Sequence, residues 1–363
     1  MRNIVVTVET IKEPIQASDG FAKKLLSEFK LDIVAKCGFG CSYCSSESGT
    51  NRRIKKVEHE AAIVAQVGRA VTPLEMRSVT LAWSEVLANL ERQVLRKRPG
   101  WGRGKTLVFS MLTDAFSPFP LMNGTTRRAL EIVLAHTEFR IRILTKNSIV
   151  GSGDWIEFFQ RFPGRFVVGL STGTLDDGLA AELELGTSTP AARIRAIRSL
   201  QDAGVPTYGM FCPVFPSTLE GVRLESLVEQ FRPELVEHVW AEPYNERINW
   251  RQVRDSLSPD RFENGWLTEV YENRAREGWS RFAADLYLRL KAHADQNDWA
   301  HKLRYLLYEE ELTAEDAARL GNMEGILLQT KPGEDGFSQN PAVAEIERRL
   351  DSPRRVGGEG EIS

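Results

Sequence analysis

The chain of 363 residues contains only four cysteines and has no long hydrophobic run. Its apolar stretches fall short of the roughly 18 to 20 residues that a membrane-spanning helix needs. The start, MRNIVVTVETIKEP, also lacks the basic and apolar regions of a secretory signal peptide. We therefore expect a cytoplasmic protein without a membrane partner. In that reducing compartment, clustered cysteines bind metals or take part in redox chemistry more often than they form disulfides.

The sequence has no large excess of either charge, since 47 lysines and arginines face 50 aspartates and glutamates. The net charge of -3 lacks the global basic signature of many dedicated nucleic-acid-binding proteins. Two basic runs, at 51–56 and 92–105, interrupt this balance. Each run is typical of a solvated helix face or loop, but two of them near an active site favour a phosphate-bearing substrate.

Short apolar and β-branched runs alternate with helix-like segments up to about residue 245. Nearly continuous apolar runs are typical of strands that helices cover on both faces. Their alternation with helices predicts βαβ units and a parallel α/β sheet. The expected strands span residues 30–37, 106–113, 140–147, 165–172, 207–214 and 238–245, and the expected helices span 125–137, 153–162, 189–204 and 224–231.

The pattern changes beyond residue 250. Residues 280–299 place apolar side chains on one helical face, whereas the segment from residue 331 is rich in glycine, proline and charge. We therefore divide the chain into an N-terminal segment (1–29), an α/β unit (30–250), a mostly helical C-terminal extension (251–330) and a largely flexible tail (331–363). Within the tail, residues 341–350 are a candidate for a short helix.

Polar or reactive residues follow each expected strand. Because the carboxyl ends of parallel strands meet at one edge of a sheet or barrel, we expect these side chains to converge on one site. They are Cys37, Thr113, Asp114, Thr145, Lys146, Ser171, Thr172, Cys212, Glu242 and Asn245.

Three of the cysteines, Cys37, Cys41 and Cys44, lie within the short segment KCGFGCSYC. Structural zinc generally needs four ligands, often from two separated pairs, and no second pair is present in the sequence. A distant histidine or Cys212 as the fourth ligand keeps zinc open as an alternative. A four-iron cluster suits three thiolates better. It would leave one iron without a protein ligand, and an open metal position is typical of a reactive site.

The Cys-x3-Cys-x2-Cys spacing, with an aromatic residue before the third cysteine, resembles the signature of the radical S-adenosylmethionine (radical SAM) superfamily. The resemblance implies that residues 30–250 form a partial (β/α)6 TIM-like barrel. It also implies a [4Fe-4S] cluster, S-adenosyl-L-methionine as cofactor, and an external one-electron donor of the flavodoxin or ferredoxin type. Members of this superfamily cleave the cofactor reductively and abstract hydrogen from a substrate.

Several further segments, among them SMLTDAFSPFP, RIRILTKN, PVFP and WAEPYNER, resemble the spore photoproduct lyase-like, or DNA repair photolyase-like, branch of that superfamily. For Asp114 and Ser171, helix capping is an alternative to cofactor binding, and Lys146 has the alternative of a solvated strand end. Glu184 and Arg193 either hold the cofactor or form a structural ion pair. The resemblance assigns the cluster to Cys37, Cys41 and Cys44, the cofactor to Tyr43, Thr113, Asp114, Lys146, Ser171, Glu184 and Arg193, and the substrate to Glu242, Asn245 and Arg247.

The sequence departs from spore photoproduct lyase at two positions. The segment FSMLTDAF has no cysteine near the second strand end, and Ser45 stands where the lyase has a tyrosine. True photoproduct lyase activity is therefore not expected. Cys212, if it faces inward, is a candidate alternative hydrogen donor; otherwise it is a small buried hydrophobic residue.

These features predict a radical SAM enzyme that acts on a nucleobase or nucleotide-like substrate, including one within a nucleic acid. The same chemistry on a small metabolite or peptide is an alternative. A non-catalytic, metal-containing or cluster-containing nucleic-acid-binding protein is another, although the C-terminal helices carry no recognisable groove-reading motif.

Overall fold

The computed structural model describes residues 4–9, 11–44, 55–245, 249–329 and 332–351. Within these residues, the main sheet has nine strands in the order β2-β3-β6-β7-β8-β9-β10-β11-β12. Neighbouring strands are parallel except for β2 and β3. The strands are Ile15–Ala17 (β2), Phe29–Leu31 (β3), Thr106–Phe109 (β6), Arg140–Thr145 (β7), Phe166–Ser171 (β8), Thr207–Val214 (β9), Val236–Pro243 (β10), Leu303–Leu307 (β11) and Ile326–Leu328 (β12).

The α/β class with a parallel sheet is confirmed, and the six expected strands lie side by side as β3, β6, β7, β8, β9 and β10. The expected strand 30–37 is wrong in one respect, because the chain leaves the main sheet after Leu31. Asp32 accepts hydrogen bonds there from the backbone N–H of Thr113 (3.1 Å) and its hydroxyl (2.9 Å). Residues Val34–Cys37 form β4, which belongs to a separate sheet.

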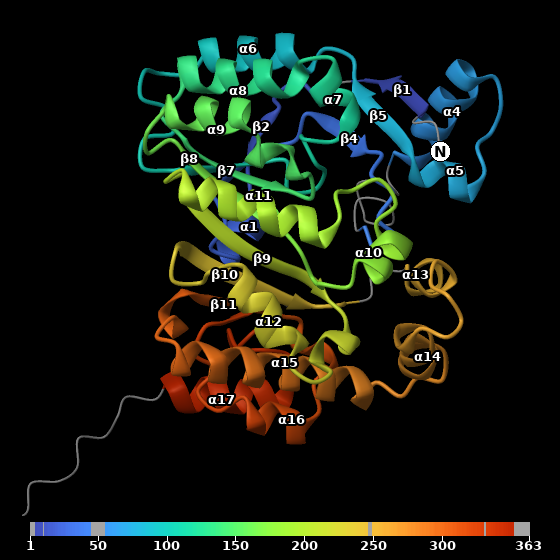
Figure 1. Cartoon of the computed structure of the whole chain (residues 1–363), viewed down its shortest axis with the longest axis vertical. Helices are drawn as coiled ribbons and strands as arrows, with labels where there is room; N and C mark the ends of the chain where they lie inside the picture. Colours follow the sequence, from blue (N-terminus) through green and yellow to red (C-terminus); the bar gives the residue numbers. More distant parts are fainter. Residues whose placement is uncertain (1–3, 10, 45–54, 246–248, 330–331, 352–363) are drawn as a thin grey trace, which may run out of the picture.

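That second sheet has the order β1-β5-β4 within the described residues. Strand β5 pairs in parallel with β1 and antiparallel with β4. In Figure 1 this sheet lies beside the end of the main sheet, with α4 and α5 packed around it. Its remaining elements are Ile4–Val8 (β1), Val79–Trp83 (β5), Lys56–Val67 (α4) and Pro73–Arg77 (α5).

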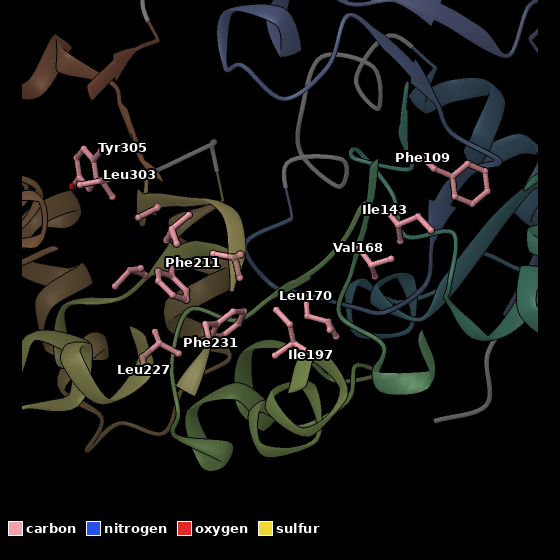
Figure 2. Close-up of a cluster of buried hydrophobic side chains, with 14 of the residues drawn as sticks. Phe109, Ile143, Val168, Leu170, Ile197, Phe211, Leu227, Phe231, Leu303 and Tyr305 are labelled. Carbon is pink, nitrogen blue, oxygen red and sulfur yellow. The ribbon is translucent and has the colours of Figure 1, made fainter. Parts of the chain in front are cut away.

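The helices that follow the central strands lie along one face of the main sheet (Figure 1). Outward side chains such as Ile143, Val168 and Phe211 form the core between the sheet and these helices, as Figure 2 shows. Burial of each such side chain contributes about 1.5–3 kcal/mol. The expected helices are confirmed as α8, α9, α11 and α12. The helices from residue 86 to 230 are Val86–Leu95 (α6), Pro118–Met122 (α7), Thr125–His136 (α8), Gly153–Gln160 (α9), Asp177–Leu183 (α10), Pro190–Asp202 (α11) and Arg223–Gln230 (α12).

Helix α11 illustrates how the sequence sets these elements. The hydroxyl of Thr189 accepts a hydrogen bond from the Ala192 N–H (3.3 Å), and Pro190 occupies the first turn. Ile197 and Leu200 are fully buried. Gly204 follows the helix with a φ of 72°, which glycine adopts readily.

The region beyond residue 250 is largely helical, as expected, but it also contributes β11 and β12 to the main sheet. Helix α17 coincides with the helix candidate at 341–350 in the tail segment, and it buries Val343, Ala344 and Ile346. Residues 330–331 and 352–363 lie outside the described residues. Among the described helices, none has the length and apolarity required to cross a bilayer. The C-terminal helices are Trp250–Asp255 (α13), Phe262–Leu267 (α14), Glu277–Gln296 (α15), Ala314–Arg319 (α16) and Pro341–Asp351 (α17).

The opposite, inner face of the sheet is covered by the N-terminal segment. Helix α1 (Asp19–Lys23) and the residues after it lie there, and the indole N–H of Trp240 donates to the Lys24 carbonyl oxygen (2.9 Å). Leu26 is buried in the same apolar cluster as Tyr208 and Trp240. Helix α1 and the residues that follow it therefore form part of the inner core.

Candidate active site

A cavity of about 420 Å³ lies at the carboxyl ends of the central strands. Its volume falls within the range of about 300–1,000 Å³ that is common for small-molecule sites. Convergence of the strand ends therefore places most of the sequence-predicted residues together. Those that line the cavity are Cys37, Cys41, Tyr43, Cys44, Thr113, Asp114, Thr145, Lys146, Ser171, Cys212, Glu242 and Asn245. Thr172 is buried and does not line it.

The loop that carries the cysteines is held by backbone contacts with the α10 end. Cys41 forms an antiparallel bridge with Glu184, and the Ser42 N–H donates to the Leu183 carbonyl oxygen (2.8 Å). Gly40 has a φ of 74°, and a side chain there would crowd the backbone of Arg77. The loop thus has a defined path over the cavity before the chain reaches Cys44.

Burial controls the protonation of Cys37 and Cys41. Burial, together with the nearby Cys44 and Asp114, raises the pKa of Cys37 to about 12. Burial and the neighbouring Glu184 raise the pKa of Cys41 well above its ordinary value. A bound cation would reverse this preference, because metals coordinate the thiolate form.

The three clustered cysteine thiols, of Cys37, Cys41 and Cys44, are a candidate set of metal ligands. Three thiols on one loop lining one cavity have the donor chemistry of an iron–sulfur site. Among the described residues, however, no three cysteine, histidine, aspartate or glutamate side chains are arranged so that they could hold a metal ion. The residues therefore fit a cluster by type and by the cavity that they share, and their arrangement as ligands is a prediction.

Asp114 joins the ends of β6 and β7. Its carboxylate accepts from the Thr145 hydroxyl (2.9 Å) and from the backbone N–H groups of Lys146 and Phe116 (2.8 Å each). Burial raises the pKa of Asp114, although these hydrogen bonds favour the ionised form. Its contacts include the local turn but also the next strand, so capping alone does not describe the residue.

Lys146 points into the cavity from the end of β7. Its ammonium donates to the Ser171 hydroxyl (2.8 Å) and lies 5.6 Å from the centre of the Tyr43 ring. Ser171 in turn donates to the Cys212 carbonyl oxygen (2.8 Å). A chain of polar contacts thus links the ends of β7, β8 and β9.

Glu184 and Arg193 do not line the cavity but form an ion pair behind it. Arg193 is 1% exposed and Glu184 is 8% exposed. Burial raises the pKa of Glu184, and Arg193 opposes that shift. Tyr43 donates to the Glu184 carboxylate, and Arg193 donates to the Ser171 carbonyl oxygen (2.9 Å). This arrangement favours the structural reading of the pair, which supports the cysteine loop.

Cys212 faces the cavity, because the alternation of β9 puts Tyr208, Met210 and Cys212 on the inner side. Its thiol donates to a carboxylate oxygen of Glu242 (3.3 Å). Burial and the charge of Glu242 raise the pKa of Cys212, so the thiol is neutral near pH 7. Asn245 lines the cavity beside this pair. Ser45 and Arg247 lie outside the described residues.

Among the polar residues of the cavity that sequence reasoning missed are Lys24 and Tyr308. Tyr308 directly follows β11. The expectation that polar residues after parallel strands gather at one site would therefore have included Tyr308 if LRYLL had been recognised as a strand. Lys24 has no comparable local signal, because only the packing of α1 against the inner face brings it there.

No protein-family model matches the chain. Uncharacterized protein ORF301 of Acidianus two-tailed virus is 24% identical over 247 residues, which cover 66% of this chain and 74% of the relative. Uncharacterized protein Rv2578c of Mycobacterium tuberculosis (strain ATCC 25618 / H37Rv) is 31% identical over 139 residues, or 37% of this chain. The match spans 39% of that mycobacterial relative's length.

The solved structures with a similar fold include variants of one enzyme. The chain is similar to spore photoproduct lyase. A Cys-to-Ser variant of that lyase has a TM-score of 0.46 at 14% identity and covers 77% of this chain and 79% of its own. Native anSMEcpe with bound AdoMet has a TM-score of 0.40 at 12% identity, covering 74% of this chain and 61% of its own. The chemistry of this chain is therefore argued from its own site.

Proposed function

We propose that this chain is a radical SAM enzyme in which Cys37, Cys41 and Cys44 hold a [4Fe-4S] cluster beside bound S-adenosyl-L-methionine. The observation that carries the proposal is the opening of all three thiols and the polar ends of β6 to β10 onto one cavity. When bound, the cluster and cofactor supply an organic radical that abstracts hydrogen from an unreactive C–H bond. The chain's own residues bind, orient and exclude water.

On the cofactor side, Lys146 is suited to bind a carboxylate. Among the described residues, its ammonium forms a hydrogen bond only with the neutral hydroxyl of Ser171. Asp114 fixes the backbone of Lys146 and so positions this side chain. Tyr43 presents its ring at the same place, where it can contact an adenine. Thr113 lines the cavity next to this group and is itself anchored to Asp32.

On the substrate side, Cys212 donates hydrogen to the product radical, and Glu242 orients the thiol. The S–H bond breaks homolytically, a C–H bond forms on the substrate, and a thiyl radical stays on the protein. One electron from an external flavodoxin-type or ferredoxin-type donor, with a proton from solvent, restores the thiol. Apolar walls that include Met111 and Met210 suit a flat substrate such as a nucleobase.

The test is anaerobic reconstitution of the full chain with iron and sulfide, followed by reduction with dithionite in the presence of S-adenosylmethionine. We expect about four irons per chain and release of 5′-deoxyadenosine and methionine, measured by mass spectrometry. Cys41→Ala should lose the iron. Cys212→Ala, a matched substitution outside the three clustered cysteines, should retain it. Wild-type protein that binds one zinc and no iron, or that releases no 5′-deoxyadenosine when iron-loaded, would overturn the proposal.

A further inference from the structure

One part of the cavity wall comes from outside the central strands. Lys24 and Phe21 belong to the N-terminal segment, and Leu306 and Tyr308 come from the end of β11. The indole of Trp240 anchors the Lys24 backbone, so the position of this lysine is fixed by the inner core. A cationic side chain is therefore built into this wall.

The ammonium of Lys24 has unused hydrogen-bonding capacity. It donates to the Tyr308 hydroxyl (3.1 Å), which is its one hydrogen bond among the described residues, and it forms no ion pair within them. An ammonium carries three N–H donors. Burial lowers the pKa of Lys24, but the nearby Glu242, Tyr308 and Cys212 raise it more, and the net shift is upward. The side chain therefore keeps its charge.

The two lysines of the cavity lie on different sides of Cys212. The charges of both Lys146 and Lys24 act to lower the pKa of the Cys212 thiol, against the larger upward effect of burial. Lys146 contacts Ser171 and Tyr43, next to the cysteine loop, whereas Lys24 contacts Tyr308 and interacts electrostatically with Glu242. If Lys146 binds the carboxylate of the cofactor, Lys24 remains for a second ligand.

Resting on the proposed function, we propose that Lys24 and Tyr308 bind an anionic group of the substrate, a carboxylate or a phosphate, and so hold the substrate against Cys212. Charge-assisted hydrogen bonds from a buried ammonium are stronger than neutral ones and are directional. Glu242, which lies in β10 beside Cys212, accepts from a donor group of the substrate. The preferred substrate is thus a small molecule with a partly apolar body and one anionic end.

The test measures binding to the full chain with two pairs of probes. Thymidine 5′-monophosphate is compared with thymidine, and glutamate with glutamine, by calorimetry and by the shift in Tm. We expect the anionic member of at least one pair to bind tenfold or more tightly than its neutral counterpart, and the pair that responds identifies phosphate or carboxylate. Lys24→Met should remove this preference, and Lys24→Arg should keep most of it.

Lys23→Met is the matched control, because Lys23 is exposed on the same helix. It should bind the probes like the wild type. An absent preference for anions in the wild type, or a preference that survives in Lys24→Met of unchanged Tm, would overturn the inference. The measurement needs no reduced cluster. Failure of S-adenosylmethionine cleavage in a parallel wild-type assay would count against the proposed function alone.

Discussion

The two ends of the inner face of the sheet differ in the surroundings of their charged side chains. Toward the amino ends of the strands, Arg142 is 6% exposed and lies between the rings of Tyr208 and Trp240, with its guanidinium 4.8 Å from each ring centre. At the carboxyl ends, Lys146 on the same strand opens into the cavity. One end is packed and the other is open, which is the division between stability and chemistry typical of parallel barrels.

The change from packing to chemistry takes place within a few residues of each strand. Strand β10 directs His238, Trp240 and Glu242 to the inner face, and only the last of them lines the cavity. The alternation of a strand keeps all three on one side. Substitutions at the cavity end should therefore change binding and rate, whereas those at the packed end should change the free energy of unfolding.

The largest effect is expected at the cavity. Cys41→Ala removes one cluster ligand, so 5′-deoxyadenosine release should fall at least about 1,000-fold, equivalent to about 4 kcal/mol. The measurement is the initial rate after reconstitution, with Arg142→Met as the control from the packed end. A Cys41→Ala rate within tenfold of the wild type would contradict the division between the two ends.

Arg193→Met should cause the largest loss of stability. It leaves the buried Glu184 carboxylate without its cation, and breaking such a pair costs about 3–5 kcal/mol. Equilibrium urea unfolding checks this value. Arg161→Met is the control, since its ion pair with Glu157 is exposed and should contribute less than about 1 kcal/mol. Equal effects of the two substitutions would show that the ion pair behind the cavity does not support the fold.

Two glycines of the same strand region allow a sharper comparison. A Cβ at Gly169 would overlap the ring of Tyr208 at the packed end, and one at Gly173 would overlap the carbonyl oxygen of Pro213, next to Cys212. Gly169→Ala should lower the free energy of unfolding by about 1–3 kcal/mol, because a side chain has to move. Gly173→Ala should also displace the Cys212 strand end and reduce product formation. Urea unfolding and product assays separate the two, and an unchanged product yield in Gly173→Ala would argue against a precise position for Cys212.

Cys212→Ala should reduce product formation by about tenfold, equivalent to about 1.4 kcal/mol, because the proposed hydrogen donor to the product radical is lost. 5′-Deoxyadenosine release should fall by less, so the ratio of product to 5′-deoxyadenosine decreases. Mass spectrometry measures both compounds in one reaction. A ratio identical to that of the wild type would leave Cys212 as a packing residue.

The smallest effect is expected from His238 at the packed end. Burial, helped by Arg304 and Arg142, lowers the pKa of His238 to about 4, compared with about 6.5 in the unfolded chain. Between these values the unfolded chain binds more protons, so this contribution to stability is present above about pH 6.5 and is lost as the pH falls toward 4. Since the residue is only half-buried, the loss should be below about 1 kcal/mol.

His238→Gln should therefore weaken the pH dependence of the urea midpoint between pH 7.5 and pH 4.5. His136→Gln, at an exposed position, is the control. If the urea midpoint of the wild type falls no more steeply with decreasing pH than that of His238→Gln, the pKa of His238 is not lowered in the folded protein.

Much of the candidate site could be predicted because each expected strand and the polar residue that follows it lie within one short segment of the sequence. The spacing of Cys37, Cys41 and Cys44 and the apolar runs before Lys146 and Cys212 are visible within short segments. The remaining features depend on distant partners. The break between β3 and β4 occurs where Asp32 binds Thr113, 81 residues along the chain. An uninterrupted apolar run cannot reveal such a contact.

The structural ion pair shows the same limit in another form. The residue types of Glu184 and Arg193 suited either a cofactor site or a salt bridge, and only their burial behind the cavity separates the two readings. Likewise, the helical pattern beyond residue 250 did not reveal the short strands β11 and β12. Strand β11 pairs with β10, which lies far upstream in the sequence, and β12 pairs with β11.

The packing of the N-terminal segment on the inner face has a practical consequence for protein production. Leu26, together with the α1 residue Phe21, covers an apolar cluster that includes Met210, Trp240 and Leu306. A polypeptide that begins at residue 30 would leave this surface bare. Apolar surface of that kind promotes aggregation, so such a fragment is expected to collect in inclusion bodies even though it contains all three clustered cysteines.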